Sequence, residues 1–194
     1  MGNQHDALVF LADGFEEIEG LGAIDILRRG GMNVTSVSVN DTAEVTGAHG
    51  IKTVADKTVA DVADVKPTWV VLPGGLPGAD NLYKSEQVQA HLKDQIDRDA
   101  YIAAICASPA VVLAQSGLMT GKHMTCYPGF DAYCKDAFLE DRRAVVDGKF
   151  VTANGPSSVT NMCYEILKIE MGEHVAVKVM NDMLIYPKEE PYFF

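Results

Sequence analysis

The sequence contains few cysteines and no long hydrophobic run, and its positive charges are scattered. Its four cysteines form no Cys-x-x-Cys motif and have no histidine at zinc-finger spacing, so we expect free thiols and no metal site. Lys and Arg occur as singles or pairs in a chain of net charge −11, which argues against a nucleic-acid partner. The first apolar run, residues 7–12, is too short for a signal-peptide core or a membrane span. We therefore expect a cytoplasmic protein with no membrane partner.

Short apolar runs alternate with helix-like segments along the 194 residues. This length suits a single domain over residues 1–194. The patterns predict strands at 7–12, 33–39, 68–75, 101–105, 123–127, 143–147 and 149–153. They predict helices at 16–29, 85–99, 109–116, 158–171 and 173–183. Such alternation is typical of an α/β fold with a mostly parallel sheet and helices on both faces, in which sites gather at the carboxyl ends of strands.

Cys106 lies at one of these carboxyl ends, between the strand "YIAAI" and a helix that begins near Pro109. Free backbone N–H groups and the positive end of the helix dipole stabilise a thiolate, so this position predicts a lowered pKa for the thiol. The alternative is a buried, inert cysteine, because free cysteine is among the most buried residue types. The residues around position 106 do not decide between the two.

Two further features favour a reactive thiol. The turn "LPGG" places Gly74 and Gly75 after a buried strand, where their backbone N–H groups could form an oxyanion hole, although an ordinary loop explains a Gly-Gly pair equally well. Glu19 shares a helix face with small and apolar residues, so its carboxyl is expected to face the sheet and to remain protonated near neutral pH. By contrast, Glu16 and Glu17 are expected to be solvated charges at the helix start.

Four segments together resemble the ThiJ/PfpI superfamily, on the branch that includes a Parkinson-linked protein deglycase. They are "ALVFLADGFEEIE", "LPGG", "AAICASPA" and the Gly-Pro pair at 155–156, and they cover nearly the whole chain in the order of the family. The resemblance implies a flavodoxin-like three-layer sandwich, a homodimer and no cofactor. It also implies that Cys106 is the nucleophile, that Glu19 is the protonated acid beside it, and that Gly75 and Ala107 are oxyanion-side donors.

The sequence departs from the family pattern at the pocket. Many members carry a histidine where this chain has Tyr127, so the usual base is absent. His49 falls where this branch carries an arginine near the pocket mouth, and it could bind an anionic group of a substrate. The family motif Gly-Pro-Gly reads Gly155-Pro156-Ser157 here, which could alter the loop that faces the pocket.

The remaining histidines and cysteines are expected to be structural or solvent-exposed. The histidines are His5, His91, His123 and His174, and the cysteines are Cys126, Cys134 and Cys163. Strand alternation predicts that Cys126 points away from the pocket that Tyr127 faces. The aromatic tail, Tyr192 to Phe194, could cover a partner protomer, although a frayed terminus is the default expectation.

Three functions fit these residues. The first is a slow glyoxalase or deglycase, in which the Cys106 thiolate adds to a small reactive aldehyde such as methylglyoxal and Glu19 carries the proton. The second is a non-enzymatic redox sensor or chaperone that is oxidised at Cys106. The third, an amidotransferase-like hydrolase or peptidase, needs a Cys-His-acid relay and is disfavoured by Tyr127. The first two use the same residues, so the sequence does not separate them.

Overall fold

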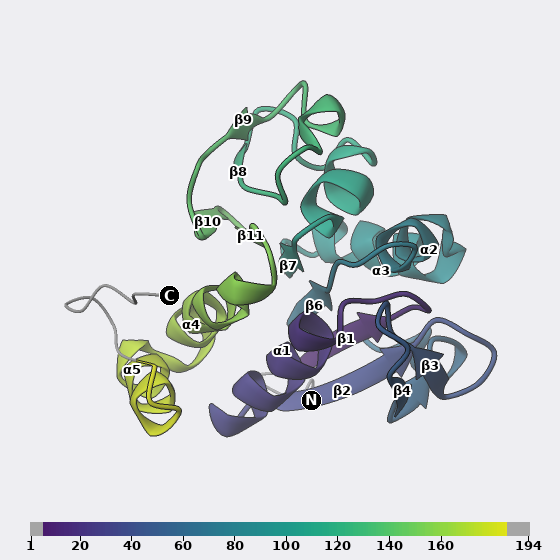
Figure 1. Cartoon of the computed structure of the whole chain (residues 1–194), viewed down its shortest axis with the longest axis horizontal. Coiled ribbons are helices and arrows are strands. Elements are labelled where there is room, and N and C mark those ends of the chain that lie inside the picture. The colour runs from purple at the N-terminus through teal and green to yellow at the C-terminus, as the bar shows by residue number, and fades with distance from the viewer. Residues whose placement is uncertain (1–5, 186–194) are drawn as a thin grey trace.

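The computed structural model describes residues 6–185, and its centre is a seven-stranded sheet (Figure 1). The strands follow the order β10-β11-β7-β6-β1-β2-β5. Their bounds are β1 Asp6–Leu11, β2 Asn33–Ser38, β5 Lys57–Thr58, β6 Trp69–Leu72, β7 Tyr101–Ile105, β10 Ala144–Asp147 and β11 Phe150–Ala153. Only the β10–β11 pair is antiparallel, so the predicted mostly parallel sheet is confirmed.

Helices cover both faces of the sheet, as Figure 1 shows. One face packs against α1 Glu17–Arg29, α4 Val159–Met171 and α5 Glu173–Asp182, and the other packs against α2 Gly78–Lys84 and α3 Glu86–Asp97. Alternate residues of the central strands enter opposite layers: Val9 packs with α1, whereas Phe10 packs with α3. The three-layer α/β sandwich expected from the resemblance is therefore present.

The structure adds small elements that the hydrophobic patterns missed. They are the hairpin of β3 Glu44–Thr46 with β4 Lys52–Val54, the helix α2, and the two-residue strands β5 and β9 Phe138–Leu139. The expected strand at 123–127 is reduced to β8, His123–Met124, and the segment after Cys106 is a π-helix over Pro109–Ala114. These pieces are too short, or too exposed, to give a clear period in the sequence.

Three polar residues are more buried than predicted. Glu16 caps α1, because its Oε2 accepts a hydrogen bond from the Glu19 N–H at 2.8 Å. Glu17 accepts hydrogen bonds from the backbone and ring of His49 and is buried too. His91, expected on an exposed helix face, lies against the ring of Phe10 at 5.2 Å, and burial lowers its pKa. Glu17 and His91 find their partners outside their own helix, whereas Glu16 is buried as the cap of α1.

The sheet packing leads to a first prediction, which compares two isoleucines. Ile102 on β7 is fully buried, whereas the Ile96 side chain on α3 is 41% exposed. Ile102→Ala removes packed methylene groups from the core and should lower the free energy of unfolding by about 2–5 kcal/mol. The matched control, Ile96→Ala, should change it by no more than about 0.5 kcal/mol. Urea unfolding measures both values, and equal losses would contradict this description of the core.

Candidate functional site

Cys106 occupies a strained turn at the carboxyl end of β7. Its φ angle of 63° lies in the left-handed region, which side chains with a Cβ rarely adopt. Both backbone groups hold the turn in place: the Cys106 N–H donates to Ala153 O at 2.9 Å, and its carbonyl accepts from the Tyr127 N–H at 2.8 Å. Neighbouring strands therefore fix a conformation in which the side chain is presented at the sheet edge, as in nucleophile elbows.

Glu19 approaches this turn from the first helical turn of α1. It is fully buried, as its helix face predicted, and its Oε2 accepts a hydrogen bond from the Gly74 N–H at 2.7 Å. Its other oxygen, Oε1, has no partner of hydrogen-bonding geometry among the described residues. The carboxyl nevertheless interacts with the Cys106 thiol, because each group shifts the pKa of the other.

The two glycines after β6 have different roles. The Gly74 N–H is already bonded to Glu19, so it is not a free donor for an oxyanion. Gly75 adopts a φ of +85°, and a Cβ there would collide with the backbone of Glu16. The N–H groups of Gly75 and Ala107 both interact with the Cys106 sulfur and lower the pKa of the thiol. Of the three expected donors, Gly75 and Ala107 are thus placed to stabilise negative charge at the elbow.

The net pKa shift of Cys106 is opposite to the sequence prediction. Burial, followed by the neighbouring Glu19 carboxylate, raises the pKa of the thiol to about 12. The two N–H donors only partly offset this, and the π-helix at Pro109–Ala114 is too short to contribute a large dipole. The expectation of a lowered pKa omitted the desolvation of the sulfur and the charge of its acidic neighbour.

Glu19 is shifted in the direction that the sequence predicted. Burial is the largest cause and raises the pKa of this carboxyl to about 7, although the Gly74 N–H and the Cys106 thiol act against the shift. The carboxylate raises the thiol pKa only while it is ionised, so the two groups titrate as a pair. Near neutral pH the pair loses one proton; the higher pKa of the thiol keeps the remaining proton mainly on the sulfur, and a minor form carries it on Glu19 beside a thiolate.

Tyr127 and the Gly155-Pro156 turn lie on the solvent side of Cys106. The Tyr127 backbone is bonded to Cys106, while its side chain is 46% exposed. A Cβ on Gly155 would lie 3.4 Å from the Tyr127 ring, so the ring covers this glycine, and Pro156 begins the next short helix. Cys126, in contrast, is buried. That the two neighbours point in different directions stays a prediction.

His49 lies on the turn of the β3–β4 hairpin and is tied to Glu17 rather than to the elbow. Its Nδ1 is 2.6 Å from Glu17 Oε2, and its side chain is 69% exposed. Ligand atoms of Glu16, Glu17 and His49 lie within 4.8 Å of one another, but hydrogen bonds already engage these groups. His123 is paired with Glu140. No histidine is among the groups that shift the pKa of Cys106, so the described residues offer no imidazole base there.

A parallel α/β sandwich with a strained cysteine turn at the end of a central strand has the geometry of a nucleophile elbow. The model of the DJ-1/PfpI family matches residues 5–169, and the chain belongs to this family. Among the described residues, no helix is long and apolar enough to cross a membrane.

Relatives in plants, insects and protists support this assignment. Protein DJ-1 homolog B of Arabidopsis thaliana is 36% identical over 93% of this chain, which spans 41% of that relative. The structure of oxidized DJ-1 of Toxoplasma gondii has 35% identity and a TM-score of 0.89, covering 94% of this chain and 99% of the other. The structure of Drosophila melanogaster DJ-1beta has 34% identity and a TM-score of 0.90, and the match covers 95% of this chain and 100% of the Drosophila chain. The chain spans less than half the length of the two Arabidopsis relatives.

The shared titration of Cys106 and Glu19 predicts the pH dependence of alkylation. As pH rises through about 7, the pair loses its first proton and thiolate becomes accessible, so the rate of Cys106 modification by iodoacetamide should rise in a step there. Glu19→Gln keeps the size of the side chain but removes the ionisable group, and the step near this pH should disappear. Peptide mapping after timed labelling measures the rate at each cysteine.

Two outcomes would contradict this assignment. The first is a step near neutral pH that persists in Glu19→Gln. The second is faster labelling of the fully buried Cys163 than of Cys106 in the native wild-type protein.

Proposed function

We propose that this protein acts on small reactive carbonyl compounds, with Cys106 as nucleophile and Glu19 as proton carrier, as part of a response to chemical stress. The observation that carries the proposal is the contact between a strained thiol and a buried carboxyl whose pKa is raised to about 7. A carboxyl with this pKa can donate and accept a proton near neutral pH, which is what acid–base catalysis requires.

The chemistry can be written for methylglyoxal. The Cys106 sulfur bonds to the aldehyde carbon, and the carbonyl oxygen takes a proton from Glu19, which gives a hemithioacetal. Glu19 then moves the proton from that carbon to the neighbouring carbon, and the hydroxyl proton passes to the former ketone oxygen, so the aldehyde carbon is oxidised to a thioester while the ketone is reduced to an alcohol. Water cleaves the resulting thioester to lactate and restores the thiol. The N–H groups of Gly75 and Ala107 would stabilise the oxyanions.

Tyr127 sets the expected rate. A phenol hydroxyl donates a hydrogen bond but is a poor proton acceptor. We therefore assign Tyr127 to holding the substrate, with Pro156 beside it in the pocket wall. His49 is exposed near the start of α1, where it could meet an anionic group of the substrate.

The N–H groups of Gly75 and Ala107 also favour a second function, redox sensing at Cys106. Oxidation of the Cys106 thiolate by two peroxide molecules would give a sulfinate and two molecules of water. The partnerless Oε1 of Glu19, when protonated, and the N–H groups of Gly75 and Ala107 would be available to hydrogen-bond those new oxygens. The Toxoplasma gondii structure is described as oxidized, which supports redox sensing as the alternative to catalysis.

Steady-state assays on methylglyoxal test the catalytic proposal. We expect slow lactate formation that Cys106→Ser abolishes and that Glu19→Gln lowers by about 10²- to 10⁴-fold, because the amide cannot exchange the proton. Tyr127→His should increase kcat with a dependence on pH near the imidazole pKa of about 6.5. No turnover by either the wild type or Tyr127→His, with Cys106 reduced, would leave redox sensing as the function.

We also propose a homodimer that uses the surface beside α1. Ile18 and Ile51 are 60% and 53% exposed, and both lie next to Glu17, which also accepts a weak hydrogen bond from the Ile51 N–H. Val54 on β4 is 71% exposed. Exposed apolar side chains gathered in this way favour association of two copies. The aromatic tail, Tyr192 to Phe194, lies outside the described residues.

Light scattering at micromolar concentration tests the dimer. We expect twice the chain mass of 21.0 kDa for the wild type, and a shift toward one chain mass in Ile51→Glu, because a carboxylate would be buried in the interface. Phe138→Glu is the control, since Phe138 is 58% exposed on β9, away from α1 (Figure 1). A wild type of one chain mass would rule out the dimer.

A further inference from the structure

Two thiols that the proposed function does not use face each other behind the pocket. Cys126 follows β8, and Cys134 ends a short 3-10 helix over Asp131–Tyr133, so the segment between them forms the loop that carries Tyr127. Both side chains are buried in the same apolar layer. The thiols are close enough to act as hydrogen-bonding partners, and this interaction is the largest influence on each of them.

The pair is asymmetric, with Cys134 as the more acidic thiol. The hydrogen bond from Cys126 lowers the pKa of Cys134, against the opposing effects of burial and of the Asp131 charge. The same interaction, together with burial and the Cys134 charge, raises the pKa of Cys126. In its reduced state the Cys134 sulfur also lies 3.8 Å from Phe130 O. The hydrogen bond favours the charged form of Cys134, and a cavity reaches Cys134, so we assign it as the thiol that meets the oxidant first.

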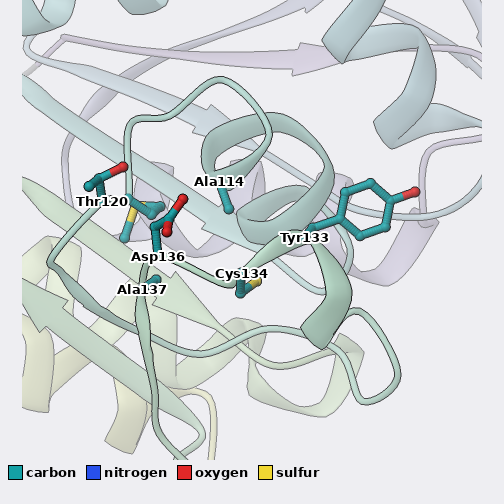
Figure 2. Close-up of a pocket in the computed structure, with 7 residues that line it drawn as sticks. Ala114, Thr120, Tyr133, Cys134, Asp136 and Ala137 are labelled. Atoms are coloured by element: carbon teal, nitrogen blue, oxygen red, sulfur yellow. The ribbon is translucent and has the colours of Figure 1, made fainter.

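A small cavity gives Cys134 a route to solvent. Its volume is about 20 Å³, and its wall includes Cys134, Asp136, Thr120 and Tyr133. Figure 2 shows Thr120 and Asp136 next to each other, Cys134 beside them, and the Tyr133 ring turned away from all three. A cavity needs roughly 10–15 Å³ to hold one water molecule, so an oxidant of similar size fits beside the sulfur.

We propose that Cys126 and Cys134 are a peroxide-sensitive dithiol that closes to a disulfide across the loop that carries Tyr127. The Cys134 sulfur attacks the terminal oxygen of a hydroperoxide, the O–O bond breaks, and the alcohol or water leaves with a proton. The Cys126 sulfur then attacks the Cys134 sulfenic acid, the S–O bond breaks, and the hydroxyl group leaves as water with the Cys126 proton. The two thiols lose two electrons and two protons, and the peroxide accepts them.

The proposed closure does not use the carbonyl chemistry at Cys106, although the charge of Cys106 does act on Cys126. Closure would join the two ends of the loop and move the Cys134 thiol away from Phe130 O. The Phe130 ring lies between the rings of Tyr127 and Tyr133, with centroid distances of 6.4 and 6.1 Å. The oxidised loop would therefore hold one wall of the pocket in a fixed position. The free thiols of the reduced protein leave the same wall able to adjust.

The test uses the full chain in wild-type form and in a Cys106→Ser background, which removes the elbow thiol. After treatment with limited hydrogen peroxide, the protein is denatured, alkylated with iodoacetamide and digested with trypsin. Cys126 and Cys134 fall in one peptide, residues 123–135, and Cys163 falls in another, residues 150–168. We expect the first peptide to lose two hydrogen atoms and to carry no alkyl group, and dithiothreitol before alkylation should restore two alkyl groups.

The controls distinguish a specific disulfide between Cys126 and Cys134 from unselective oxidation of the cysteines. Cys126→Ser should leave Cys134 as a sulfenic or sulfinic acid with no closed peptide, and Cys163 should stay fully alkylated in every sample. Peroxide-treated Cys106→Ser protein in which both thiols are still alkylated, or in which Cys134 carries a sulfinic acid beside a free Cys126, would overturn the proposal. A disulfide that forms in the wild type but not in Cys106→Ser would overturn the direct step at Cys134.

Discussion

The hydrogen bond from the Gly74 N–H to Glu19 Oε2 joins the three parts on which the site depends. Glu19 comes from α1, Gly74 follows β6, and Cys106 follows β7. A Cβ on Gly74 would lie 2.6 Å from that of Cys106, so only glycine allows the turn to pass between the acid and the thiol. This bond holds one carboxyl oxygen in place and leaves the other without a partner in the direction of the sulfur. A buried carboxyl held in this way is costly to ionise, which keeps its proton available near neutral pH.

Burial therefore has opposite consequences for the two groups of the site. It raises the pKa of Glu19 into the physiological range, where a proton can move in either direction, and it raises that of Cys106 well above this range. The thiol consequently depends on its neighbour: thiolate is stabilised when Glu19 keeps the proton, and is disfavoured when Glu19 is ionised. The catalysis and the oxidation proposed for Cys106 would both draw on the proton of this pair, so one geometry would support either function.

Much of the fold could be predicted because its central strands are continuous apolar runs. The strands β1, β6 and β7 and the burial of Glu19 follow from local patterns, and so does the position of Cys106 at a strand end. The β3–β4 hairpin and α2 could not be predicted, since their stability comes from contacts outside themselves, such as the hydrogen bond from the Ala48 N–H to Phe15 O.

Electrostatic properties were harder to predict than element positions. The pKa of Cys106 was expected to fall because the helix start was visible in the sequence, whereas the depth of burial and the nearby carboxylate were not. The burial of Glu17 depends on His49, which lies 32 positions along the chain. Cys126 and Cys134 were expected to be unrelated thiols, because a loop in the sequence does not show which of its side chains meet.

The central claim is that burial keeps the Glu19 carboxyl protonated up to near neutral pH, where it can exchange a proton with the Cys106 sulfur. Carbon-13 NMR of the Glu19 carboxyl, assigned by comparison with Glu19→Gln and followed across a pH series, measures this directly. The structure predicts a titration midpoint at about 7 for the reduced protein. A midpoint close to the ordinary value of 4.5 would show an ionised, conventionally solvated carboxylate, and would contradict the account of the site.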